Sequence, residues 1–275
     1  MKNSLLVAVF SLLFFTACAQ EKQQKQFTAT KSIKMENKMK IEIWSDIMCP
    51  FCYIGKRNFE KALSQFPNKE FIELEWKSFQ LDPAMPEVPK YQDDMYMFVA
   101  DRKGMSYEQS KKRHEELIQY AKSVGLEYNL DKALVTNSMK GHRIIQFAKT
   151  RGLGEKAEET LFNAYFTQGK NLNDSTTLIE LGKAIGLTEA EVNTALTNPL
   201  YVQKVEEDSR EAQTLGARGV PFFVVNRKYA IAGAQQPDEI LQTLEKSFTE
   251  WRIENPQTTL DITEGRVCTP EGDCN

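Results

Sequence analysis

The sequence has no marked excess of charge of either sign. Its 275 residues include 35 lysines and arginines against 38 aspartates and glutamates, for a formal net charge of -3. No stretch stands out as rich in lysine and arginine. A nucleic-acid-binding protein needs a basic surface that neutralises phosphates. We therefore expect no nucleic acid among the partners of this chain.

Histidine is nearly absent. His114 and His142 are the only two, and neither forms a cluster with a cysteine along the sequence. The C-terminal cysteines Cys268 and Cys274 have five residues between them, whereas structural zinc sites use shorter spacings. We therefore expect no metal ion.

Long apolar runs are also missing, with one exception at the N-terminus. Residues 5–15 form an apolar run after Lys2, and Thr16, Ala17 and Cys18 follow it. The run is too short to span a bilayer comfortably and has the form of a signal peptide. Residues 15–18 resemble a bacterial lipobox, in which Cys18 becomes the lipidated first residue of the mature protein. We interpret residues 1–18 as a lipoprotein-type signal peptide; the alternative is a plain secretory signal with an incidental cysteine.

Both interpretations predict export. We expect a periplasmic protein held at the membrane by a lipid anchor on Cys18. Residues 19–39 are polar and rich in glutamine and lysine, which predicts a flexible tether. A translation start at Met35 or Met39 would instead leave the same domain in the cytosol.

Secondary-structure signals after the tether begin with a strand, a helix and a second strand. Residues 40–46 alternate apolar and polar side chains, residues 53–66 show helical spacing, and residues 71–79 alternate again. This order is typical of the start of a βαβ unit.

Residues 91–216 carry helical periodicity with almost no alternation of the strand type. Ser106 and Gln109 have the spacing of a capping box, and Asp174 is placed to cap another helix. Strand signals return at residues 222–226 and 229–232, and residues 237–248 read as an amphipathic helix. The predicted fold class is α/β, with one domain formed by residues 40–90 and 200–250, a helical insertion at residues 91–199 and a C-terminal tail at residues 251–275.

Two cysteines lie where the first strand meets the first helix. Cys49 falls at the helix start, where unpaired N–H groups and the helix dipole favour a thiolate, so it is the expected nucleophile. Pro50 suits the first helical position. Cys52 lies one turn further on and is the expected resolving thiol. The alternatives are half of a zinc site or a structural disulfide, but a C-x-x-C motif between strand and helix favours redox chemistry.

Several segments together resemble the FrnE-like branch of the DsbA family. They are Asp46 to Lys56 (DIMCPFCYIGK), Ser78 to Pro83 (SFQLDP), Asn137 to Arg143 (NSMKGHR) and Gly219 to Val224 (GVPFFV), in this order. The resemblance implies a thioredoxin-like fold with a large inserted helical domain. It also implies a cis peptide bond between Val220 and Pro221 beside the active sulfur, with backbone groups that bind substrate. We expect Phe51, between the two cysteines, to contact substrate as well.

The chain departs from this family at one informative position. Family members often carry a buried acid six residues before the nucleophile, where this chain has Ile43. A proton acceptor for Cys52 must then be another group, such as Asp46 or water. We interpret His142, on a helix of the insertion, as an ordinary helix residue in preference to a site residue.

A second cysteine pair lies in the tail. Pro270, Gly272 and Asp273 between Cys268 and Cys274 bend the chain and favour a disulfide. We interpret this pair as a structural disulfide, which exported proteins commonly have. The alternative is an auxiliary redox pair that exchanges with Cys49 and Cys52.

The sequence therefore predicts an exported thiol-disulfide oxidoreductase, oxidase or isomerase, that needs no cofactor. Its expected partners are thiol- or disulfide-containing proteins and an unidentified redox partner. One alternative is a glutathione-dependent enzyme of the kappa-class transferase or 2-hydroxychromene-2-carboxylate isomerase type, although those relatives typically have a serine or a single cysteine at the helix start. The other alternative is a chaperone-like binding protein without catalysis.

Overall fold

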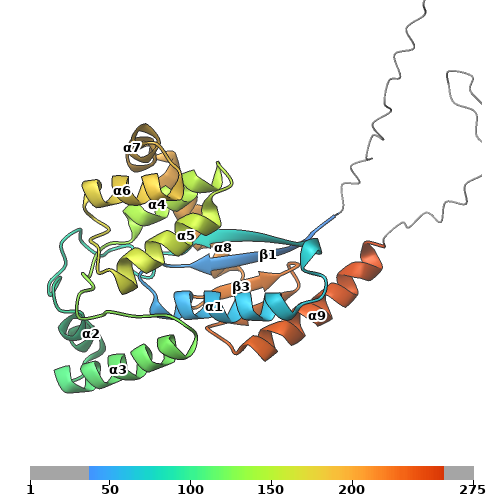
Figure 1. Cartoon of the computed structure of the whole chain (residues 1–275), viewed down its shortest axis with the longest axis horizontal. Coiled ribbons are helices and arrows are strands. Elements are labelled where there is room, and N and C mark those ends of the chain that lie inside the picture. Colours follow the sequence, from blue (N-terminus) through green and yellow to red (C-terminus); the bar gives the residue numbers. More distant parts are fainter. Residues whose placement is uncertain (1–36, 257–275) are drawn as a thin grey trace, which may run out of the picture. The chain divides into compact units, whose positions relative to one another are not determined.

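The computed structural model describes residues 37–256. The chain forms a mixed four-stranded sheet in the order β2-β1-β3-β4, with helices packed around it (Figure 1). Most of the helices come after β2 and before β3 in the sequence. The elements are β1 (Met39–Ser45), α1 (Pro50–Gln65), η1 (Lys69–Phe71), β2 (Ile72–Ser78), α2 (Met95–Lys103), α3 (Tyr107–Ser123), α4 (Met139–Lys149), α5 (Gly154–Phe162), η2 (Asn163–Thr167), α6 (Ser175–Ile185), α7 (Glu189–Thr197), α8 (Leu200–Thr214), β3 (Phe222–Val225), β4 (Tyr229–Ala232) and α9 (Pro237–Glu254).

Strand β1 lies inside the sheet and organises it. It pairs in parallel with β2 and antiparallel with β3, and β3 pairs antiparallel with β4. The parallel β1–α1–β2 connection confirms the βαβ start that the sequence predicts. Because β1 pairs with β3, the end of β1 meets a segment that follows the whole helical insertion.

The two faces of β1 pack against different helices. Ile41 and Ile43 lie in a core with apolar residues of α1 and α9, as the strand alternation predicts. Trp44, on the other face, lies in a cluster with Ala212 of α8. Helices α1 and α9 therefore cover one face of the sheet and α8 covers the other. Helix α9 runs to Glu254, beyond the predicted end at Phe248 and into the residues predicted as tail.

Capping residues define the helices of the insertion. Ser106 and Gln109 form the predicted capping box at the start of α3, and Asp174 accepts a hydrogen bond from the Thr177 backbone at the start of α6. At the start of α4 it is the Asn137 side chain that accepts a hydrogen bond, from Met139 N at 2.8 Å. Within residues 37–256, none of the helices combines the length and apolar character that a membrane crossing would need.

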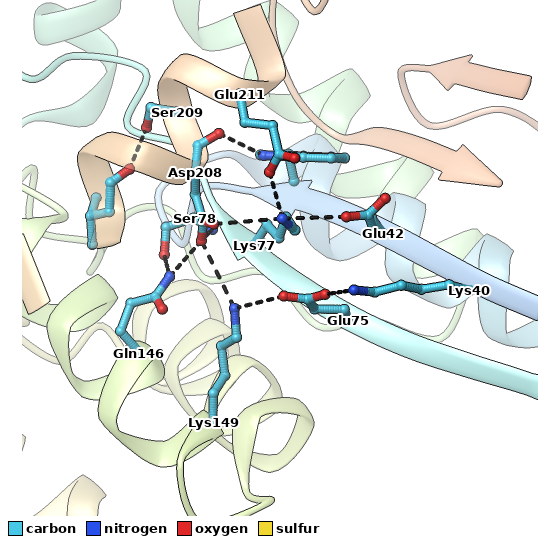
Figure 2. A network of polar contacts seen from close by, with 12 residues as sticks. Lys40, Glu42, Glu75, Lys77, Ser78, Gln146, Lys149, Asp208, Ser209 and Glu211 are labelled. Atoms are coloured by element: carbon cyan, nitrogen blue, oxygen red, sulfur yellow. Dashed lines mark hydrogen bonds and ion pairs between the residues drawn. The ribbon is translucent and has the colours of Figure 1, made fainter. Parts of the chain in front are cut away.

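A polar network joins the sheet to α4 and α8 (Figure 2). The Lys77 ammonium group on β2 pairs with Glu211 of α8 and, at 3.3 Å, with the buried Glu42 of β1. Gln146 of α4 donates hydrogen bonds to Ser78 Oγ at 2.9 Å and to Asp208 Oδ2 at 2.6 Å. These contacts fix α4 relative to the strands. Helix α4 also carries His142.

Candidate active site

Cys49 is the N-cap residue of α1. Its backbone is extended, its N–H donates to the Asp46 carbonyl oxygen at 2.9 Å, and the first turn of the helix that follows contains no acidic residue. The side chain is 5% exposed. The sulfur therefore lies at the positive end of a helix, where a negative charge is stabilised.

Cys52 lies one turn further into α1 and is 1% exposed. The two cysteines are free thiols in this structure. Burial and the neighbouring Cys49 raise the pKa of the Cys52 thiol well above its usual value. Cys49 is therefore the more exposed of the two thiols, and Cys52 is a protonated thiol deeper in the fold.

The segment before β3 closes the site on the other side of Cys49. The peptide bond between Val220 and Pro221 is cis, as the family resemblance implies. The Cys49 thiol points at the Val220 carbonyl oxygen, with Sγ and O 3.5 Å apart. Phe51, 46% exposed, stands on the surface of the same motif. The structure thus brings Phe51 and Val220, two of the predicted substrate-contacting residues, to the cysteine pair.

Tyr128, from the segment between α3 and α4, holds the motif from the side of the insertion. Its hydroxyl donates to the Pro50 carbonyl oxygen at 2.7 Å, and its ring stacks on Phe166. Burial raises the pKa of Tyr128, and Cys49 and Cys52 raise it further. No spacing in the sequence points to Tyr128, because its contact with Pro50 depends on how the insertion folds back.

The interpretation of His142 as an ordinary helix residue is wrong. His142 is completely buried, and its Nε2 atom lies 3.3 Å from Asp46 Oδ1. Asp46 also accepts hydrogen bonds from the backbone N–H groups of Met48 at 3.1 Å and Leu81 at 2.8 Å. A carboxylate and an imidazole therefore meet directly behind the loop that carries Cys49.

A cavity of about 330 Å³ lies beside this loop. Its wall includes Met48 and Pro50 from the motif region, and further residues come from α2, from α3 and from the segments that follow β2 and α3. The lining is largely apolar and contains three methionines, Met48, Met85 and Met95. Methionine side chains adapt to ligands of different shape. The cavity can therefore accept apolar groups of varied outline next to the cysteine pair.

Three predicted cysteine sites lie outside the described residues. They are the lipidation site Cys18 and the tail pair Cys268 and Cys274. The signal peptide, most of the tether and most of the tail lie outside them too. These assignments stay predictions.

Comparisons with known proteins match this geometry to one family. The family model of the DsbA-like thioredoxin domain matches residues 40–245. The chain is similar to the crystal structure of a probable DsbA oxidoreductase from Streptomyces coelicolor, with 35% identity and a TM-score of 0.71 over 86% of this chain and 98% of that one. The match confirms the predicted thioredoxin-like fold and the DsbA family; the FrnE-like branch stays a prediction.

Two further relatives are more distant. The cytosolic disulfide reductase DsbM from Pseudomonas aeruginosa, in a structure with GSH, has 17% identity and a TM-score of 0.55 over 76% of this chain and 99% of that one. At this identity the likeness concerns the fold alone. The uncharacterized protein YwbO from Bacillus subtilis is 26% identical over 193 residues, which are 67% of this chain and 86% of that protein.

Proposed function

The chain belongs to the DsbA-like thioredoxin family of thiol-disulfide oxidoreductases, and from this premise we propose that Cys49 and Cys52 exchange disulfides with other proteins. One observation carries the proposal: the Cys49 sulfur lies at a helix N-terminus facing the Val220 carbonyl oxygen, and Cys52 lies buried behind it. This arrangement separates a thiol that attacks from a thiol that resolves.

The exchange proceeds in two steps. The Cys49 thiolate attacks one sulfur of a substrate disulfide, the substrate S–S bond breaks, and the leaving sulfur departs as a thiolate. Cys52 then attacks Cys49 and releases the second substrate sulfur, which leaves the enzyme oxidised and the substrate reduced. Run backwards, the same steps donate a disulfide. The direction in the cell depends on the redox partner.

Three features support polypeptides as the substrates. Phe51 presents an exposed aromatic ring beside the cysteines, and the backbone carbonyl group of Val220 faces Cys49. The methionine-rich cavity adjoins the same loop, which suits apolar side chains of varied shape. We propose that substrate polypeptides place apolar residues near the cysteine that reacts.

The test uses the full-length chain and a substrate protein with one accessible disulfide. Cys52→Ala should accumulate a mixed disulfide between Cys49 and the substrate, visible on a non-reducing gel, and Cys49→Ala should abolish both the mixed disulfide and turnover. Client activity that is unchanged in Cys49→Ala would support the binding-protein alternative instead. Glutathione conjugation at full rate in Cys52→Ala would support the glutathione-dependent alternative.

We also propose export to the periplasm and membrane attachment through Cys18. The apolar run and the lipobox-like residues 15–18 support this. Cys18→Ala should shift the protein from the membrane fraction to a soluble exported fraction. Recovery of the unprocessed, unmodified chain from the cytosol would contradict the proposal.

A further inference from the structure

Behind the loop that carries Cys49, ionisable side chains gather that the two exchange steps do not use. Asp46 follows β1, His142 comes from α4, Glu158 from α5 and Tyr165 from η2, and all four are buried. Three of them belong to the helical insertion. Only Asp46 and His142 make a hydrogen-bonding contact with each other, at 3.3 Å.

Four polar atoms of the three residues other than Asp46 have no partners among residues 37–256. They are Nδ1 of His142, both carboxylate oxygens of Glu158 and the hydroxyl oxygen of Tyr165. Buried polar atoms are nearly always paired, so a group of unpaired buried polar atoms needs an explanation. Burial raises the pKa of Glu158 to about 7, although the neighbouring His142 and Lys56 act to lower it. Glu158 therefore exists in both protonation states near neutral pH.

Cys52 creates a need for such groups. It must lose its proton before it can attack Cys49, yet it is buried away from water and its pKa is raised. Besides Cys49, Asp46 is the ionisable residue whose backbone and side chain act on the Cys52 thiol. A buried thiol that must lose a proton needs a buried acceptor.

The other charged and titratable groups around the site are already engaged. On α1, Lys56 pairs with Glu60 and, at 2.8 Å, with Glu159. On α4, Lys149 lies 3.6 Å from Glu75 and 3.9 Å from Asp208. Tyr128 donates its hydroxyl proton to the Pro50 carbonyl oxygen. None of these groups is a free proton acceptor at neutral pH.

We propose that Asp46, His142 and Glu158 form one buried set that takes up the proton of Cys52 when Cys52 resolves the mixed disulfide. The inference rests on the proposed function and adds to it the residues that carry the proton. His142 and Glu158 act through Asp46 as positioning residues, and they tie the chemistry of the cysteine motif to the inserted helices.

In the resolving step, Cys52 gives its proton to the set, and its sulfur forms a bond with Cys49 Sγ. The bond between Cys49 and the substrate sulfur breaks, and the electron pair leaves with the substrate as a thiolate. Protonation of the substrate thiolate by solvent and release of the proton from the set complete the cycle. The mixed disulfide is the only oxidant involved.

Ellman's reagent tests the proposal in the full-length chain with Cys18, Cys268 and Cys274 changed to serine, so that Cys49 and Cys52 are its only thiols. The reagent then yields one coloured thiolate when Cys49 attacks and a second when Cys52 resolves. This three-serine chain is the wild-type reference for the variants below. In the wild type we expect the rate constant of the second release to rise up to about pH 7 and then to level off. In Glu158→Gln and His142→Gln it should be at least about tenfold lower at pH 7, a smaller loss than the roughly 10²-fold or more for a complete general base, because Asp46 remains. In Glu158→Gln the rate constant should also keep rising above pH 7, because the group that titrates near pH 7 is gone.

The first release is the internal control. It should stay within about twofold of wild type in both variants and in the matched control Glu155→Gln, an exposed position on the same helix, where the second release should also be unchanged. Circular dichroism identifies a variant that fails to fold, because an unfolded chain still reacts with Ellman's reagent, and the other variant then decides. A wild-type profile without a plateau, or a Glu158→Gln variant that keeps the plateau, would overturn the proposal. Absence of both releases in the wild type would instead refute the proposed function.

Discussion

Gly55 of α1 lies directly against Pro221. A Cβ atom added at Gly55 would lie 2.8 Å from Pro221 Cγ, closer than side-chain atoms normally approach. Only a residue without a side chain lets the helix that carries Cys49 and Cys52 pack this tightly on the segment that faces them. Gly55 therefore sets the spacing between the two halves of the site.

Gly55→Ala should push the Val220–Pro221 segment away from Cys49. We expect a loss of stability of about 1–3 kcal/mol, typical of overpacking, and a slower reaction of Cys49 with substrate disulfides. Gly219→Ala is the matched control, because a Cβ atom there meets open space. Urea denaturation and the rate of mixed-disulfide formation measure the two effects; equal behaviour of the two variants would show that the contact is unimportant.

Glu158 should make stability depend on pH. Its pKa is about 7 in the folded protein, above the ordinary value of 4.5, so the folded state binds the proton more tightly than the unfolded state. The stability of the wild type should therefore fall as pH rises from 4.5 to 7, by about 3 kcal/mol from this residue. Glu158→Gln should lack this decline, which denaturation curves at several pH values would detect. The same decline in Glu158→Gln would assign it to other groups.

Lys77→Met should lower the stability of the fold by weakening the polar contacts between the sheet and α8. Lys77 is 10% exposed and pairs with Glu42, which is 1% exposed, so its removal weakens the pairing of a buried carboxylate (Figure 2). We expect a loss of about 1–3 kcal/mol, less than for a fully broken buried pair, because Arg227 still pairs with Glu42. Lys40→Met is the control: Lys40 is 44% exposed in its pair with Glu75, and exposed pairs contribute about 0–1 kcal/mol. Similar losses in both variants would contradict the role given to Lys77.

Tyr128→Phe should loosen the cysteine motif at Pro50. The variant keeps the stacked ring but loses the 2.7 Å hydrogen bond to the Pro50 carbonyl oxygen. Loss of such a bond costs about 1 kcal/mol, and more when the partner stays buried. Thermal unfolding measures this loss. Tyr107→Phe, whose hydroxyl makes no hydrogen bond within residues 37–256, should unfold at the wild-type temperature.

Local signals predict the elements and the motif well. The position of Cys49 follows from the alternation before it and the helical spacing after it, and the start of α3 follows from Ser106 and Gln109. Helix α9 is longer than predicted because Trp251 continues the apolar stripe of Leu244 and Phe248 into the same core. That continuation is visible in the sequence once the helical spacing is followed past Phe248.

Contacts between distant segments account for what the sequence does not predict. His142 and Asp46 are 96 positions apart, and their contact depends on how α4 is held against the sheet by Gln146. The contact of Tyr128 with Pro50 likewise depends on the path of the chain between α3 and α4. Hydrophobic periodicity shows which face of a helix is buried but not which residue it will meet.

The pairing of Cys49 with Val220 across 171 positions has a consequence for synthesis. The ribosome delivers the C-P-F-C motif early, and the carbonyl group that faces its sulfur arrives only after the whole helical insertion has been made. Strand β1 meanwhile has β2 on one side and an open edge on the other, because β3 has not yet been translated. Until β3 fills that edge, the Cys49 side chain lacks the carbonyl group that faces it in the finished fold, so the cysteine motif is complete only after almost the whole domain has been made.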